Sequence, residues 1–114
     1  MTETEIYKAA LSLWGPDAQT RMVFEEMSEL QKELCKAARG KKNKAAIAEE
    51  IADVSIMLEQ MILLHECAGE VAEYKARKLE RLAAWIAEEN VADGDCETFP
   101  ESESTDSVGQ ELHD

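Results

Sequence analysis

The spacing of the helix-breaking residues constrains the fold of this chain more than any other feature. Within residues 1–90, glycine stands only at Gly15, Gly40 and Gly69, and the one proline, Pro16, follows the first of them. Proline is tolerated in the first turn of a helix, and glycine commonly follows the last turn. Between these breaks Ala, Leu, Glu and Lys dominate, and these residues favour helix over sheet. We therefore expect an all-α protein of four helices.

Apolar residues recur at helical spacing in each of the four stretches. The predicted helices cover about residues 3–14, 16–39, 44–67 and 70–89. The second carries an apolar stripe of Val23, Met27, Leu30 and Leu34. The third has a broader apolar face, made of Ile47, Ile51, Val54, Met57, Leu58, Met61 and either Leu63 or Leu64. A face this wide predicts contact on two sides, as in a helical bundle or a dimer interface.

Negative charge is concentrated at the C-terminal end of the chain. The formal charge is −13, of which residues 91–114 carry −8 without a single Lys or Arg. Apolar residues are isolated there, so this segment buries too little surface to offset its ordering entropy. We predict a helical domain at 1–90 and an acidic disordered tail at 91–114. A domain this small has a modest core, which favours completion as a homodimer or homotetramer.

The composition also limits the partners and the compartment. An acidic protein repels the phosphate backbone, so we expect no binding to nucleic acid. No apolar stretch approaches the ~20 residues of a membrane span, and no secretory signal is recognisable, so we expect no membrane association. The cysteines Cys35, Cys67 and Cys96 are odd in number and widely spaced. This pattern is typical of reduced thiols, and we expect a cytoplasmic protein.

Two acidic patches are embedded in apolar sequence. The first contains Glu25, Glu26 and Glu29, and the second contains Glu50 and Asp53. Residues three or four apart share a helix face, so Glu26 lies beside Glu29, and Glu50 beside Asp53. If the chain folds back at residues 40–44, a rise of 1.5 Å per residue brings the two patches level along the hairpin.

Carboxylates brought together in this way would repel each other in a partly dry groove, and a divalent cation would remove that repulsion. Ligation by oxygen alone indicates Mg²⁺, or Mn²⁺, rather than zinc. The alternative interpretation is ordinary surface charge, since Glu-rich helices are common. A di-iron bundle would need Glu-x-x-His pairs, and none is present.

The double acidic motif resembles a known family. Glu25-Glu26-x-x-Glu29 followed by Glu50-x-x-Asp53 is similar to the EExxE…ExxD signature of the MazG-like, all-α nucleoside triphosphate pyrophosphohydrolase superfamily. The basic segment at residues 75–82 is similar to one on the following helix of that family. The resemblance covers roughly residues 3–88. The double motif is fairly specific, whereas either half alone would be weak.

The resemblance implies a Mg²⁺-dependent enzyme that hydrolyses an NTP or dNTP to the monophosphate and pyrophosphate. It implies four-helix units assembled as dimers or as dimers of dimers. It also implies that Glu26, Glu29, Glu50 and Asp53 are the metal ligands. Glu25 would then support the ligands without contacting the metal, contact a metal itself, or act as the base that orients water.

Further residues are candidates for holding the substrate. Lys75, Lys78 and Arg81 on the last predicted helix can bind phosphate oxygens, and Lys78 is the preferred contact. Trp14 and Tyr74 either stack on a base or pack in the core or an interface. Two other functions stay open, namely a non-catalytic helical oligomerisation or regulatory module and a phosphoribosyl-ATP pyrophosphohydrolase.

Overall fold

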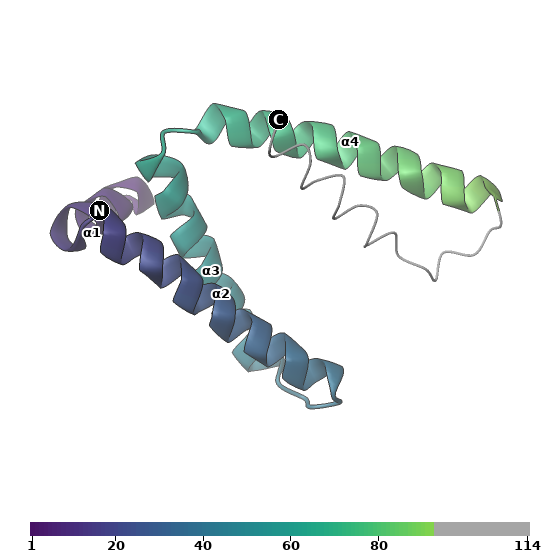
Figure 1. The fold of residues 1–114 in the computed structure, drawn as a ribbon, viewed down its shortest axis with the longest axis horizontal. Helices are drawn as coiled ribbons and strands as arrows, with labels where there is room; N and C mark the ends of the chain where they lie inside the picture. Colours follow the sequence, from purple (N-terminus) through teal and green to yellow (C-terminus); the bar gives the residue numbers. More distant parts are fainter. Residues whose placement is uncertain (93–114) are drawn as a thin grey trace. The chain divides into compact units, whose positions relative to one another are not determined.

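The computed structural model describes residues 1–92, which form four α-helices and no strand. The helices are α1 at Glu3–Trp14, α2 at Pro16–Ala38, α3 at Lys44–Leu64 and α4 at Ala68–Ala92 (Figure 1). The prediction of an all-α chain of four helices is confirmed. The predicted bounds of α1 are those observed, whereas α3 ends three residues early and α4 is longer at both ends. Almost all of the predicted tail, from residue 93 onward, lies outside the described residues.

Local chemistry explains where the first two helices begin and end. At the start of α1, the Glu5 amide donates to Thr2 Oγ1 at 3.1 Å, and the Thr2 amide donates to Glu5 Oε1 at 2.7 Å. This capping box satisfies backbone donors that a helix start otherwise leaves unpaired. Gly15 and Gly40 take φ values of +91° and +95°, which side chains disfavour. The predicted glycine breaks therefore end α1 and α2.

The described residues fall into two units, Met1–Ala68 and the residues from Gly69 onward. In the first unit, α2 and α3 form an antiparallel hairpin with the most extensive contacts, and α1 packs against both helices. In Figure 1 a short loop joins α2 and α3. The second unit contains α4. None of the helices described here is both long and apolar enough to cross a membrane.

The face that α2 turns toward α3 follows a seven-residue pattern. Its buried and half-buried positions include Gln19, Val23, Glu26, Leu30, Glu33 and Ala37, spaced alternately four and three apart. This spacing is typical of helices packed at a shallow angle. Met27 and Leu34 of the predicted apolar stripe lie outside these positions and are 45% and 48% exposed in the single chain. The inner positions in their place belong to the acidic residues Glu26 and Glu33.

The described residues have a very small core. Val23 and Met57 are the buried hydrophobic residues, and Gln19 and Gln60 are buried beside them. Large apolar side chains on every helix are exposed, among them Trp14, Phe24, Ile51, Ile56, Leu58, Leu79 and Ile86. On α3, Ile51 and Leu58 belong to the broad apolar face that predicted contact on two sides, whereas Ile56 lies outside it.

Candidate metal centre

Three carboxylates meet where α2 faces α3. Glu26 of α2 and the pair Glu50 and Asp53 of α3 each offer an oxygen atom, and these atoms all lie within 4.8 Å of one another. All three side chains are half-buried. The sequence predicted this convergence from the spacing of the two patches. An acidic group that could hold a metal ion therefore spans the two helices of the hairpin.

The helical pattern explains why these residues meet. Glu26 occupies an inner position of α2, and Glu50 and Asp53 occupy inner positions one turn apart on α3. The antiparallel course of the hairpin brings them to the same level. A carboxylate at an inner helix position costs free energy unless a partner compensates for its lost hydration. Such positions therefore point to a partner for the charge.

The crowding of the carboxylates shows in their protonation. The pKa of Glu26 is raised above its usual value, first because burial disfavours the charged form, and then because Asp53 and Glu50 lie close by. The pKa of Glu50 is raised for the same first reason, with further contributions from Asp53 and Glu29. In the metal-free chain these groups therefore hold protons more tightly than isolated glutamates do.

The donor set fits a hard divalent cation. Glu50 Oε1 is buried and has no hydrogen-bond partner in the described structure. Oxygens on opposite sides of a Mg²⁺ ion are ~4.2 Å apart, because each lies about 2.1 Å from the metal. A group of oxygens within 4.8 Å of one another therefore needs only small rotamer changes to surround such an ion. The unpaired oxygen, the all-carboxylate donor set and this spacing agree with a Mg²⁺ or Mn²⁺ site.

Glu29, the fourth predicted ligand, is not a member of the converging group. Its carboxylate lies 3.9 Å from Lys32 Nζ, and both side chains are well exposed. It is nevertheless close enough to Glu50 to raise the pKa of that residue. Glu29 thus borders the group, and its role as a ligand stays a prediction.

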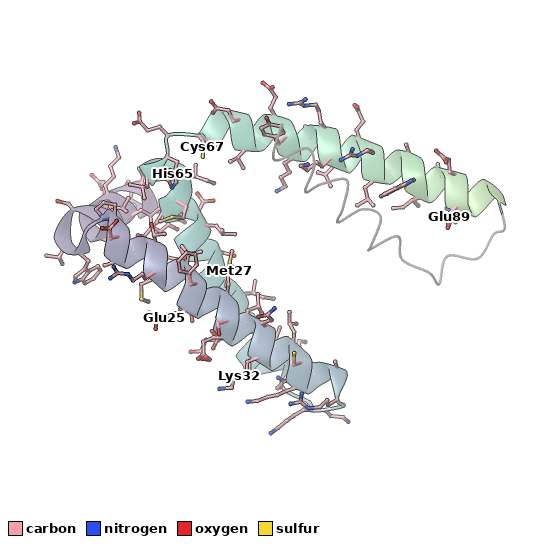
Figure 2. The ribbon with its side chains drawn as sticks, in the orientation of Figure 1. Glu25, Met27, Lys32, His65, Cys67 and Glu89 are labelled. Atoms are coloured by element: carbon pink, nitrogen blue, oxygen red, sulfur yellow. The ribbon has the colours of Figure 1, made fainter. Side chains whose placement is uncertain are left out.

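Glu25 lies on a different side of α2 from the converging group. It is exposed, as Figure 2 shows, and it lines a groove of about 550 Å³. The other lining residues are Trp14, Ala18, Gln19, Arg21 and Met22. Glu25, the neighbour of Glu26 in sequence, therefore lines the same groove as Trp14, which is one of the two predicted stacking residues. Trp14 has 62% of its surface exposed and is available to a ligand.

The predicted phosphate-binding residues belong to α4. Lys78 and Arg81 are half-buried on that helix, and Lys75 is exposed. The second predicted stacking residue, Tyr74, has Arg77 over its ring, with the guanidinium carbon 4.8 Å from the ring centroid. One face of Tyr74 is therefore already covered within its own helix, which favours Trp14 as the stacking residue. The phosphate-binding roles stay predictions.

Sequence reasoning missed the contact between Glu33 and Asn43, which lies two helical turns from the centre. Glu33 accepts a hydrogen bond from Asn43 Nδ2 at 2.8 Å and forms an ion pair with Lys36 at 3.2 Å. These contacts hold the pKa of Glu33 below its usual value, the Asn43 hydrogen bond most strongly. The signal was present, since Glu33 lies seven residues after Glu26 and so shares its helix face.

Comparison with known proteins provides no family assignment. No model of a known protein family, no curated protein and no solved structure matches the chain. The resemblance to the MazG-like superfamily therefore rests on the motif residues, and the fold and the acidic group rest on the structure itself.

Proposed function

We propose that this protein is a Mg²⁺-dependent nucleoside triphosphate pyrophosphohydrolase, which converts an NTP or dNTP to the monophosphate and pyrophosphate. The observation that carries the proposal is the convergence of Glu26, Glu50 and Asp53 within 4.8 Å. The EExxE…ExxD spacing, through which the chain resembles MazG-like enzymes, supports the reaction class. Mn²⁺ is an alternative metal with the same ligand preference.

Glu26, Glu50 and Asp53 would hold the metal, with Glu29 at the border of the group. When bound, the cation would neutralise phosphate charge and lower the pKa of water. The carboxylates' own task is to fix the metal on a rigid hairpin. Glu25 precedes Glu26 on α2, is exposed, and contributes to the raised pKa of Glu26, so the proposal keeps it as a candidate to orient water or to accept its proton.

The nucleoside and the phosphates of the substrate would contact different residues. The groove lined by Trp14, Arg21 and Glu25 is large enough for a nucleoside, since ligand pockets commonly measure about 300–1,000 Å³. Trp14 offers an exposed ring on which a base can stack. The proposal assigns the phosphate contacts to Lys75, Lys78 and Arg81, because ammonium and guanidinium groups bind phosphate oxygens.

The proposal includes self-association as a homodimer or homotetramer. Ile51, Ile56 and Leu58 lie exposed on α3, on the helix that carries two of the three carboxylates. Exposed apolar surface of this kind is typical of interfaces. A second copy would also give the small unit the core that Val23 and Met57 alone do not supply.

The test is a panel of NTPs and dNTPs incubated with the full chain and Mg²⁺, with pyrophosphate and monophosphate measured separately. We expect equal amounts of the two products from at least one nucleotide, and none in excess EDTA. Release of orthophosphate without pyrophosphate would indicate a different reaction. No turnover of any nucleotide would favour the non-catalytic module.

A further inference from the structure

We propose that Asn43 is a positioning residue for the metal centre. Its hydrogen bonds to Glu33 set the register of α2 against α3, and this register brings Glu26 to Glu50 and Asp53. The inference rests on the proposed function, since it assumes that the three carboxylates hold a metal. It assigns a role to a residue that touches neither metal nor substrate.

The contact between Asn43 and Glu33 joins the two arms of the hairpin. Asn43 Nδ2 donates to the Glu33 backbone oxygen at 2.9 Å and to Glu33 Oε1 at 2.8 Å. Both partners are acceptors only, which fixes the orientation of the amide. The other carboxylate oxygen of Glu33 pairs with Lys36 Nζ at 3.2 Å, and the Glu33 side chain is only 12% exposed. One carboxylate is thus held from both sides in a largely dry place.

Asn43 serves this contact instead of the usual role of a residue at its position. It is the N-cap of α3, where an asparagine side chain normally accepts a hydrogen bond from the first turn. Here its side chain makes no such bond, and Oδ1 is buried without a partner. The first turn of α3 contains no acidic residue in compensation. The side chain therefore supports the contact between the helices at the expense of the helix start.

The register that this contact sets leads directly to the metal centre. Glu26 lies seven residues before Glu33, and Glu50 lies seven residues after Asn43. Seven residues make two helical turns and a rise of about 10.5 Å. Because the helices are antiparallel, fixing the pair at 33 and 43 places Glu26 and Glu50 at the same level. A slip of one residue would turn a carboxylate by about 100° and move it by about 1.5 Å.

The far half of the hairpin has a weaker constraint on its register. There the cross-helix side-chain hydrogen bond in the described structure runs from Thr20 Oγ1 to Met61 Sδ at 3.8 Å. Thioether sulfur is a weak acceptor, and apolar packing tolerates small shifts. The Asn43 contact therefore constrains the register more strongly than the Thr20 contact in the far half of the hairpin.

The test is a calorimetric titration of the metal-free full chain with Mn²⁺. Asn43→Asp keeps a good N-cap and adds a negative charge, but loses the amide donor. A role in capping or in general electrostatics would leave Mn²⁺ affinity unchanged or raise it. The positioning role predicts a fall of about tenfold or more, as expected for residues that orient metal ligands. Asn43→Ala should weaken binding similarly.

Two comparison variants complete the experiment. Glu33→Gln keeps both acceptors for Asn43 and should retain affinity within a few-fold. Leu30→Ala removes packing between the Asn43–Glu33 contact and the metal centre, and should lower the melting temperature while leaving Mn²⁺ affinity within a few-fold. Unchanged affinity in Asn43→Asp and Asn43→Ala, with the wild-type chain binding Mn²⁺, would overturn the positioning role alone. A wild-type chain that binds no Mn²⁺ would overturn the metal centre and this inference together.

Discussion

Glu26 and Asp53 hold carboxylate oxygens within 4.8 Å of each other across the seam between α2 and α3. Two like charges at this distance in a half-buried place destabilise the metal-free fold, and either a proton or a cation relieves their repulsion. The proximity raises the pKa of Glu26, although burial contributes more to that rise. Without a ligand these carboxylates therefore lower the free energy of unfolding, and a bound metal would offset that loss.

Turnover should depend on the carboxylates of α3. Glu50→Gln and Asp53→Asn should each lower kcat by about a hundredfold or more, because each removes a charged ligand from a centre that stabilises the reaction electrostatically. Glu59→Gln is the matched control, since Glu59 is an exposed carboxylate on the same helix outside the converging group. Steady-state pyrophosphate release from the preferred nucleotide measures the effect, and circular dichroism checks the fold. Full activity in both variants would reject the site.

The stability of the metal-free chain should depend on pH through Glu26. Its pKa is raised above 4.5 in the folded chain, so above that pH the folded state binds more protons than the unfolded state. The free energy of unfolding then falls as pH rises through the raised pKa. Glu26→Gln removes this contribution. Its melting temperature should match that of the wild-type chain near pH 4 and exceed it increasingly toward pH 7.

Thermal melts in EDTA at a series of pH values measure this difference. Glu33 has the opposite effect, because its lowered pKa stabilises the fold at pH values above the ordinary pKa of a glutamate. Both the wild-type chain and Glu26→Gln contain Glu33, so its contribution cancels when their melting temperatures are compared. A difference between the two chains that stays constant with pH, or that shrinks as pH rises, would contradict the crowding of Glu26 with Asp53 and Glu50.

Trp14 should contact the nucleoside. Trp14→Ala should raise KM for a nucleoside triphosphate about tenfold, because base stacking on an aromatic ring contributes about 1–3 kcal/mol. Binding of inorganic triphosphate, which has no base, should not change. In a Trp85→Phe chain the remaining tryptophan is Trp14, so its emission should respond to nucleotide but not to inorganic triphosphate. Equal KM values for Trp14→Ala and the wild-type chain would place the base elsewhere.

The apolar face of α3 should be covered by a second copy. Ile51→Lys combined with Leu58→Lys would place two charges on residues that are 49% and 43% exposed in the single chain. If this face is an interface, burying these charges is unfavourable, and the variant should have a lower mass than the wild-type chain in sedimentation equilibrium. A wild-type monomer, or an unchanged oligomer in the variant, would contradict this assignment.

Much of the fold was predictable because it follows from local signals. Gly15 with Pro16, and Gly40, end and begin helices through their own backbone preferences, so these breaks could be located without tertiary information. The convergence of Glu26 with Glu50 and Asp53 followed from helix geometry and a short loop. The exposure of Met27 and Leu34 in the single chain was not predictable, because the stripe that contains them is also spaced four and three residues apart, and only the contact with α3 places Glu26 and Glu33 at the inner positions.

The rest depends on contacts between helices that no local pattern encodes. Asn43 stands at the N-cap of α3, and only the fold places its amide against Glu33. Glu29 and Glu26 lie three apart, and a helix face is too broad to decide from spacing alone which of them reaches α3. The roles of Lys75, Lys78 and Arg81 depend on where α4 lies relative to the hairpin, and the sequence does not contain that arrangement.

The most direct test of the metal centre is electron paramagnetic resonance of Mn²⁺ added to the metal-free chain, because protein-bound Mn²⁺ loses the six-line signal of the free ion. The wild-type chain should remove this signal up to a fixed stoichiometry, Mg²⁺ should restore it by competition, and Asp53→Asn should leave it nearly intact. A wild-type chain that leaves the signal unchanged, or an Asp53→Asn chain that binds as tightly as the wild type, would contradict a metal site at Glu26, Glu50 and Asp53.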